Sequence, residues 1–231
     1  MISDKRYVIR YGGRQFNLRY LSDDDIAAKE GGHKGRFQEL ELLEDIQKLG
    51  LTGTYVDAGA NVGNHTLFFA NFTQAERILA IEANPVIFEV LKRNISSNAS
   101  GAPIEMKQFA AWCEDAIVRM GDPVPGNAGR SQIHGLGPHG GARYRVSARP
   151  LDDALASYPN ITLLKMDIED AELPALEGCL ETLEVCKPVL VTEHHFPAQL
   201  KQALHLLEPL GYTLQGKTYE PRGETKMWLP S

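Results

Sequence analysis

The chain reads Val-Asp-Ala-Gly-Ala-Asn-Val-Gly-Asn-His-Thr over residues 56–66, and this stretch joins two apolar runs. The run that begins at Tyr55 is predicted to be a buried strand, and the run that ends at Phe72 a helix. A turn between such elements can approach a ligand closely only where Cβ atoms are absent, and its free N–H groups favour anionic oxygens. Gly59 and Gly63 meet that need. The turn alone predicts a nucleotide or phosphate site, with an ordinary tight connection as the alternative.

Strands and helices alternate along the chain on both sides of this turn. Strands are predicted at 55–57, 78–81, 104–109, 117–120, 161–166, 188–193, 212–214 and 227–229, and helices at 37–49, 66–72, 86–95, 151–156, 173–183 and 198–210. This alternation predicts an α/β fold with a doubly wound, mostly parallel sheet. Two β-prone runs around Gly12-Gly13-Arg14 predict an N-terminal hairpin. We therefore expect residues 1–50 to form a hairpin and helix extension packed on a core domain of residues 51–231.

The composition of the chain limits which binding partners and which cellular location are expected. With 24 basic and 30 acidic residues the net charge is −6, which gives no general attraction to nucleic acid. No apolar run is long enough to span a membrane and no signal peptide follows Met1, so a cytoplasmic location is expected. The three cysteines have no CxxC spacing, which argues against a disulfide framework and against a cysteine zinc site. No pattern predicts the oligomeric state.

Glu82 is the second feature that points to a nucleotide. It ends the next predicted strand, 23 residues after Gly59, where a carboxylate can accept both ribose hydroxyls. Together the two features predict an adenosine-bearing ligand at the carboxyl ends of the strands. The alternative for Glu82 is a surface salt bridge. The turn lacks the G-x-G-x-x-G spacing of nicotinamide binders, and Asp57 could bind the ammonium group of S-adenosylmethionine, which NAD lacks.

Two further strand ends carry polar side chains that could act on a substrate. Asp167 could meet the cofactor ammonium, a substrate hydroxyl or a metal, whereas Glu172 is expected to cap the following helix. Glu193, His194 and His195 end another apolar strand and could take a proton from a hydroxyl. We expect catalytic roles for Asp167, Glu193, His194 and His195, and substrate contacts for Lys165, Glu169 and His194. Solvent-exposed histidines are the alternative, and no metal is predicted, although a divalent ion is possible.

The stretch from Gly121 to Gly141 interrupts the pattern, because it is rich in glycine and proline and poor in large apolar residues. It is predicted to be a long loop, either a lid over a bound substrate or a plain insertion. The polar segment from Ser22 to Arg36 is expected to be mobile. Both segments, with the surroundings of His194, are where acceptor contacts are expected.

The motifs resemble those of the FkbM-type methyltransferases. The likeness rests on residues 55–70, on Glu82-Ala83-Asn84-Pro85, and on Leu164-Lys165-Met166-Asp167-Ile168-Glu169 with Ala171-Glu172. It implies a class I methyltransferase fold with a seven-stranded sheet, and O-methylation of sugars or other small molecules. The family usually has glycine where this chain has Asp170, an aspartate that can adopt the left-handed conformation at the helix entry that places Glu169. The expected cofactor contacts are Asp57, Gly59, Ala60, Asn61, Gly63, Asn64, His65, Glu82, Ala83, Asn84, Ala111 and Asp167.

These features together predict an S-adenosylmethionine-dependent O-methyltransferase that acts on a small-molecule or glycan acceptor and releases S-adenosylhomocysteine. Two alternatives stay open at this point. One is a nicotinamide-dependent oxidoreductase on a similar sheet, and the other is a non-catalytic nucleotide-binding module. The identity of the acceptor has no signature in the sequence.

Overall fold

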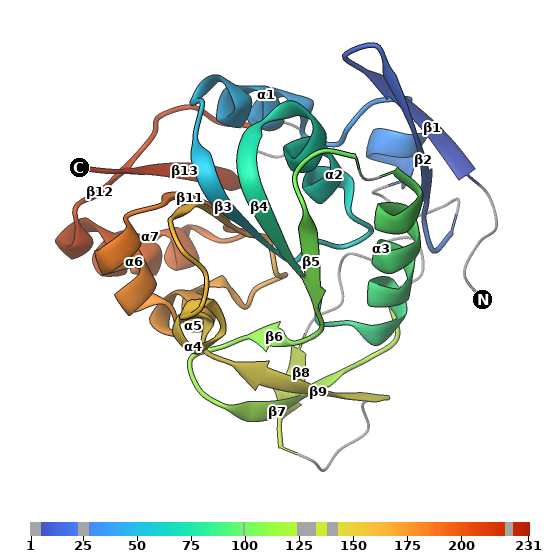
Figure 1. The fold of residues 1–231 in the computed structure, drawn as a ribbon. Helices are drawn as coiled ribbons and strands as arrows, with labels where there is room; N and C mark the ends of the chain where they lie inside the picture. Colours follow the sequence, from blue (N-terminus) through green and yellow to red (C-terminus); the bar gives the residue numbers. More distant parts are fainter. Residues whose placement is uncertain (1–5, 23–27, 99, 124–132, 138–142, 220–223) are drawn as a thin grey trace.

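A seven-stranded sheet forms the centre of the computed structural model, which describes residues 6–22, 28–98, 100–123, 133–137, 143–219 and 224–231. The strand order is β12-β13-β11-β10-β3-β4-β5 (Figure 1). Five strands run parallel: β3 (Thr52–Ala58), β4 (Gln74–Ile81), β5 (Ile104–Lys107), β10 (Ile161–Met166) and β11 (Val189–Glu193). The antiparallel pair at one edge is β12 (Tyr212–Leu214) and β13 (Thr225–Pro230). The predicted mostly parallel α/β sheet is confirmed.

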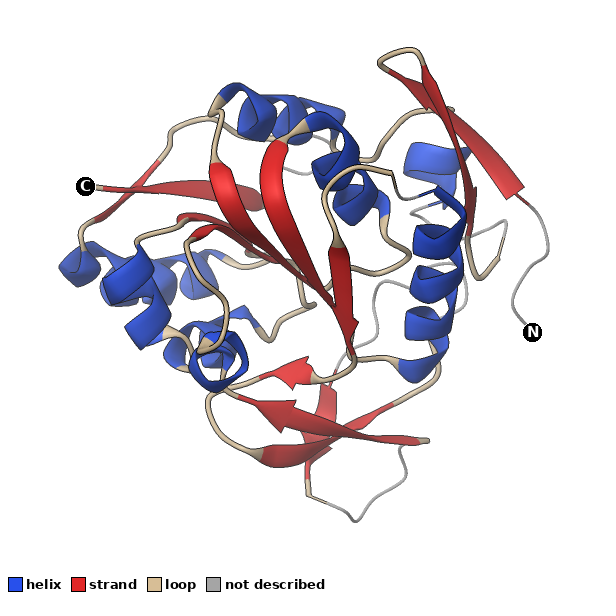
Figure 2. Cartoon of the chain, in the orientation of Figure 1, coloured by secondary structure: helices blue, strands red, loops and turns tan. Residues whose placement is uncertain are grey.

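Helices cover both faces of this sheet (Figure 2). One face carries α1 (Leu40–Lys48), α2 (Asn64–Phe72) and α3 (Pro85–Asn98), and the other carries α4 (Leu151–Leu155), α5 (Glu172–Glu177), α6 (Leu180–Cys186) and α7 (Pro197–Leu207), which continues into a 3₁₀ turn, η2 (Glu208–Leu210). Successive residues of β3 point to opposite faces of the sheet. Tyr55 packs in the hydrophobic core under α1, α2 and α3, and Val56 packs in the core under α4, α5, α6 and α7. A sheet buried on both faces explains why its strands read as continuous apolar runs.

The single helix predicted over residues 173–183 is wrong, because the structure has two helices there. The break falls at Gly178, where a Cβ atom would collide with the backbone oxygen of Trp112. The chain therefore turns between α5 and α6, which allows the backbone of Trp112 to approach closely. The glycine was the sequence signal for a helix end at this point. Trp112, the residue that requires the glycine, is distant in sequence, so the break could not be predicted from the local pattern.

The N-terminal hairpin consists of β1 (Arg6–Tyr11) and β2 (Arg14–Arg19), as predicted. It lies against α3 (Figure 1), where Asn94 and Asn98 hydrogen-bond to the β2 backbone. The segment expected to be mobile contains a short π-helical turn, η1 (Ala28–Gly32), while residues 23–27 lie outside the described structure. The extension shares one hydrophobic core with α2 and α3.

A second sheet of four strands packs beside the carboxyl edge of the main sheet (Figure 1). Its order is β6-β9-β7-β8, with β6 (Ala110–Ala111), β7 (Ala116–Met120), β8 (Ile133–Leu136) and β9 (Tyr144–Arg149). The prediction of an unbroken loop from Gly121 to Gly141 is therefore wrong, because β8 pairs with β7. Whether this stretch forms a lid over a bound substrate depends on residues 124–132 and 138–142, which lie outside the described residues.

The search for membrane-spanning helices gave a negative result over the part of the chain that the structure describes: none of its helices combines the length and the apolar character that a span requires.

Candidate active site

The carboxyl ends of the parallel strands bring most of the predicted polar residues to one edge of the sheet. Asp57 lies near the end of β3, Glu82 follows β4, Asp167 follows β10 and Glu193 ends β11. The registers align Lys165 with Asp57 and Met166 with Thr192. This edge is where open α/β sheets bind their ligands.

The glycine turn has the left-handed backbone that its sequence predicts. Close packing within the protein is an additional reason for glycine there. Gly59 and Gly63 have φ values of 78° and 91°, and Asn61 between them is also left-handed at 49°. A Cβ atom at Gly59 would collide with the backbone oxygen of Asp167, and one at Gly63 would lie 2.9 Å from Cδ1 of Leu91. Packing against the backbone therefore requires glycine at position 59, and the positive φ favours glycine at both positions, whether or not a ligand is bound.

Glu82 holds this turn in place. Its carboxylate accepts hydrogen bonds from the backbone N–H groups of Asn61, at 3.0 Å, and Asn84, at 2.8 Å. Burial raises the pKa of Glu82 to about 7, although these two N–H groups act in the opposite direction. Each carboxylate oxygen has a second lone pair with which it can accept a ribose hydroxyl.

Other residues expected at the cofactor lie around the turn. The side-chain oxygen of Asn61 is buried and has no hydrogen-bond partner among the described residues, so it can accept a bond from a ligand. Asn84 caps α3 through a 2.9 Å bond from the Val86 N–H. Ala60 and Ala111 are nearly fully buried, and Ala83 packs against the core of the second sheet. These residues fit S-adenosylmethionine.

Asp57 and Lys165 form a buried ion pair beneath the turn. Asp57 is fully buried, accepts a 2.6 Å hydrogen bond from the Thr66 hydroxyl and lies 3.2 Å from the Lys165 ammonium. The same ammonium lies 3.5 Å from Asp167. Although burial acts against its charge, these carboxylates raise the pKa of Lys165 above its usual value. Lys165, expected at the substrate, is thus placed as an internal counter-ion, and Asp57 already has two internal partners.

Asp167 is the carboxylate of this group that reaches solvent, with 35% of its side chain exposed. It forms a hydrogen bond with Glu193. Burial and the negative charge of Asp167 raise the pKa of Glu193 far above its usual range. Burial would also raise the pKa of Asp167, but Lys165 and Glu193 outweigh it and keep that pKa low. Asp167 is therefore the member of the pair with the lowered pKa, and Glu193 the member with the raised pKa.

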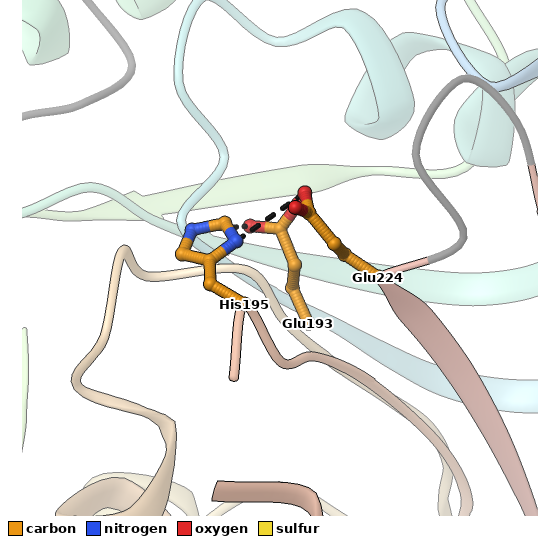
Figure 3. A group of neighbouring side chains, drawn as sticks. All are labelled: Glu193, His195 and Glu224. Atoms are coloured by element: carbon orange, nitrogen blue, oxygen red, sulfur yellow. Dashed lines mark ion pairs between the residues drawn. The ribbon is translucent and has the colours of Figure 1, made fainter. Parts of the chain in front are cut away.

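His195 lies at the centre of a carboxylate cluster (Figure 3). Its Nε2 atom is 3.5 Å from Glu193 and 3.6 Å from Glu169, and its Nδ1 atom is 3.3 Å from Glu224. Glu224, which immediately precedes β13, has no motif around it. Only the pairing of β13 with β11, which sets Thr225 opposite Glu193, brings it to the site.

His194 does not join this cluster, because neighbouring side chains at a strand end point to opposite faces. It is buried, its Nε2 atom lies 2.8 Å from the Thr192 hydroxyl, and its ring packs against Trp228. Burial lowers its pKa to about 4. This environment favours a structural role over the catalytic and substrate roles that we expected.

Two helix-start residues also have internal contacts. His65, in the first turn of α2, is buried 3.5 Å from Glu39, and burial lowers its pKa. Asn64 contacts the backbone of Gln38. Their expected cofactor contacts stay predictions.

A cavity of about 340 Å³ opens between the second sheet and the loop after β10. Its lining combines apolar and acidic side chains: Trp112, Ile133, Gly135, Leu136, Glu169, Asp170 and Ala171. The carboxylate of Glu172, the first residue of α5, accepts a 2.8 Å bond from the Ile168 N–H and so holds the loop before the helix. The expected capping role is wrong, because the N-cap of α5 has no side-chain hydrogen bond. The cavity has the size and mixed character of a small-molecule pocket.

Known proteins share this sequence pattern. Residues 57–214 match the family described as "Methyltransferase FkbM domain". Methyltransferase sdnD of Sordaria araneosa is 26% identical over 215 residues, which cover 80% of this chain and 81% of that protein. Methyltransferase 1 of Beauveria bassiana is 30% identical over 143 residues, which cover 53% of this chain and 57% of that protein.

Solved structures share the fold. The methyltransferase FkbM from Methylobacillus flagellatus has a TM-score of 0.56 at 21% identity, over 78% of this chain and 44% of that longer chain. The chain thus spans less than half the length of that structure. Aeropyrum pernix fibrillarin, solved with natively bound S-adenosyl-L-methionine, has a TM-score of 0.51 at 7% identity, over 98% of this chain and 82% of that chain. The fold is that of the class I methyltransferases.

Proposed function

The chain belongs to the FkbM methyltransferase family, and from this premise we propose that it methylates a hydroxyl group of a small-molecule or glycan acceptor. The methyl donor is S-adenosylmethionine, and S-adenosylhomocysteine is the product. Membership of a methyltransferase family removes the nicotinamide alternative. The observation that carries the oxygen-directed proposal is the carboxylate of Asp167, which follows β10 beside Gly59, is 35% exposed and has a pKa that Lys165 keeps low.

The protein contributes mainly by positioning the two reactants. Glu82 and the turn around Asn61 would hold the adenosine, with the sulfonium near Asp167, whose negative charge favours it. When bound, the cofactor supplies an electrophilic methyl group, whose bond to sulfur breaks as the new bond to oxygen forms. Asp167 is the residue that we expect to accept the hydroxyl proton, because Lys165 keeps its pKa low, whereas burial and Asp167 raise the pKa of Glu193.

The cavity supports a polyhydroxylated acceptor. Trp112 offers an aromatic surface on which the C–H face of a sugar ring can pack, while Glu169 and Asp170 can accept hydroxyl hydrogen bonds. Ile133 and Leu136 close the apolar side.

The test uses deuterated-methyl S-adenosylmethionine with a panel of sugars and hydroxylated small molecules, and mass spectrometry to locate the label. Asp167→Asn should lower kcat at saturating cofactor by about 10²-fold or more, with an unchanged circular dichroism spectrum. Asp153→Asn, an exposed acid on α4, is the matched control. Label found on nitrogen or carbon, or full activity in Asp167→Asn, would contradict the proposal.

A further inference from the structure

The cluster around His195 has the composition and the spacing of a metal site. Glu193, His195 and Glu224 each offer one ligand atom, and these atoms all lie within 4.8 Å of one another. Glu193 lies 3.5 Å from Nε2 of His195 and Glu224 lies 3.3 Å from Nδ1 (Figure 3). Because a histidine binds one ion through one ring nitrogen, only one of these distances joins two ligands of the same ion, and the other glutamate must shift to reach it. Two ligands of one ion with bonds of about 2.0–2.2 Å stand about 3.0–3.5 Å apart. We propose that these three residues bind a divalent transition-metal ion.

The charges around the cluster support a cation there. Glu169 adds a third carboxylate, 3.6 Å from Nε2 of His195, and Asp167 bonds to Glu193 from the other side. The buried cation of this edge, Lys165, already lies between Asp57 and Asp167. Three carboxylates, those of Glu169, Glu193 and Glu224, thus converge on one imidazole in a partly buried setting. A bound divalent ion would neutralise them.

The elements that carry the ligands form a stable frame for an ion. Glu193 and His195 flank the end of β11, and Glu224 leads into β13, which pairs with β11 through backbone hydrogen bonds. The side chains of the three are 17–25% exposed, so an ion can enter without unfolding the edge. The cavity that Glu169 lines lies beside the cluster and leaves room for an acceptor.

The ligand types indicate which ion binds. One imidazole with two carboxylates suits Mn²⁺, Fe²⁺ or Zn²⁺, whereas Mg²⁺ and Ca²⁺ prefer oxygen ligands alone. Three protein ligands leave coordination positions open, as in sites where a metal acts on a substrate. Given the proposed function, two adjacent oxygens of the acceptor would fill them, and the ion would make the hydroxyl more acidic. The acceptor would then be a chelating compound such as a vicinal diol.

Mn²⁺ binding to the full chain, freed of metal with EDTA, tests the site by electron paramagnetic resonance and calorimetry. We expect one ion per chain, with binding at least tenfold weaker in His195→Ala and in Glu224→Gln. His205→Ala and Glu184→Gln, exposed residues of α7 and α6, should bind as the wild type does. Mg²⁺ should bind more weakly than Mn²⁺.

Two outcomes would overturn the metal site. One is the lack of saturable Mn²⁺ binding up to about 1 mM, a concentration that covers even weak protein sites. The other is wild-type affinity in both His195→Ala and Glu224→Gln. S-adenosylhomocysteine binding in the same samples separates the two proposals. If it is retained without Mn²⁺ binding, the metal site alone fails, whereas its loss in the wild type would overturn the proposed methyltransferase.

Discussion

Asp170 occupies a backbone conformation that normally favours glycine, with φ at 71°, next to Glu169 at 54°. The related motif has glycine here, so the structure gives a physical reason for that preference. Aspartate tolerates the left-handed region better than most residues. Its Oδ1 atom also accepts a 2.9 Å hydrogen bond from Gln199 on α7. The substitution therefore keeps the loop that carries Glu169.

Substitutions at Asp170 should separate backbone strain from the hydrogen bond. Asp170→Ala loses the bond and keeps a left-handed backbone, so we expect a loss of about 1–2 kcal/mol in the free energy of unfolding. Asp170→Gly loses the bond but relieves the strain, and should stay within about 1 kcal/mol of the wild type. Urea unfolding measures both. Equal losses in the two variants would mean that the hydrogen bond dominates.

The raised pKa of Glu82, about 7 because of burial, predicts pH-dependent binding of the adenosine group. Ribose hydroxyls donate to the ionised carboxylate, so affinity should rise as the pH rises through 7. Between pH 6 and pH 8 the gain should be about tenfold, since the ionised fraction changes by that factor. Calorimetry with 5′-methylthioadenosine measures it, because this ligand has no amino-acid group of its own to titrate.

Two controls identify Glu82 as the group responsible. The 2′,3′-dideoxy form of the ligand should bind weakly at every pH, because it lacks the donors. Glu82→Gln should remove the pH dependence. Burial also raises the pKa of Glu172 to about 7, and a pH dependence that persists in Glu82→Gln would point to that residue instead.

Among the elements, β3 and β10 are joined by more than their backbone ladder. Asp57 and Lys165 lie opposite each other in the register, both buried, and their charged groups are 3.2 Å apart. Asp167 adds a second carboxylate at 3.5 Å. Removing the cation would leave two carboxylates unpaired, one of them fully buried, which is more costly than removing an exposed pair.

Lys165→Met should therefore lower the free energy of unfolding by about 3–5 kcal/mol. Adding Asp57→Asn should recover part of this loss, because the most deeply buried negative charge is then removed. Thermal and urea unfolding of the two single variants and the double variant give the coupling. Lys92→Met, on the surface of α3, is the control and should cost less than about 1 kcal/mol. A Lys165→Met loss as small as the control would refute the buried ion pair.

Strand pairing also decided which predicted residues came together. The sequence placed Glu193, His194 and His195 together at one strand end, but strand geometry separates His194 from its neighbours. The sequence did not indicate Glu224, which the antiparallel pairing of β13 with β11 brings to the site. The sequence also did not predict β9, because the alternation of apolar and polar residues in a short basic segment does not identify the strand with which the segment pairs.

In the molecule as a whole, the N-terminal extension and the main domain share one aromatic core. Phe16 of the hairpin packs edge-on against Phe37, which also contacts Phe68 of α2 and Phe72. Phe37 is fully buried. Glu39, two residues later, reaches His65 and accepts a hydrogen bond from Thr225. The extension thus supports the same sheet edge that carries the site.

Phe37→Ala should test whether the extension and the main domain unfold together. Removing a fully buried ring costs about 3–5 kcal/mol. If the two regions form one cooperative unit, a single urea transition should shift as a whole, whether it is followed by circular dichroism or by S-adenosylhomocysteine binding. Two separate transitions, with the binding-competent domain unaffected, would show that the extension folds independently.

Local sequence determined the alternating elements, the glycine turn and the acidic residue that follows β4. These features depend on hydrophobic periodicity and on backbone conformations that few residues tolerate, so a short window contains them. Tertiary structure alone decided that Lys165 is an internal counter-ion, that the pKa of Glu193 is raised while that of Asp167 is lowered, and that Glu224 stands beside His195. Charge state and ligand geometry depend on burial and on neighbours that are distant along the chain, which no local pattern encodes.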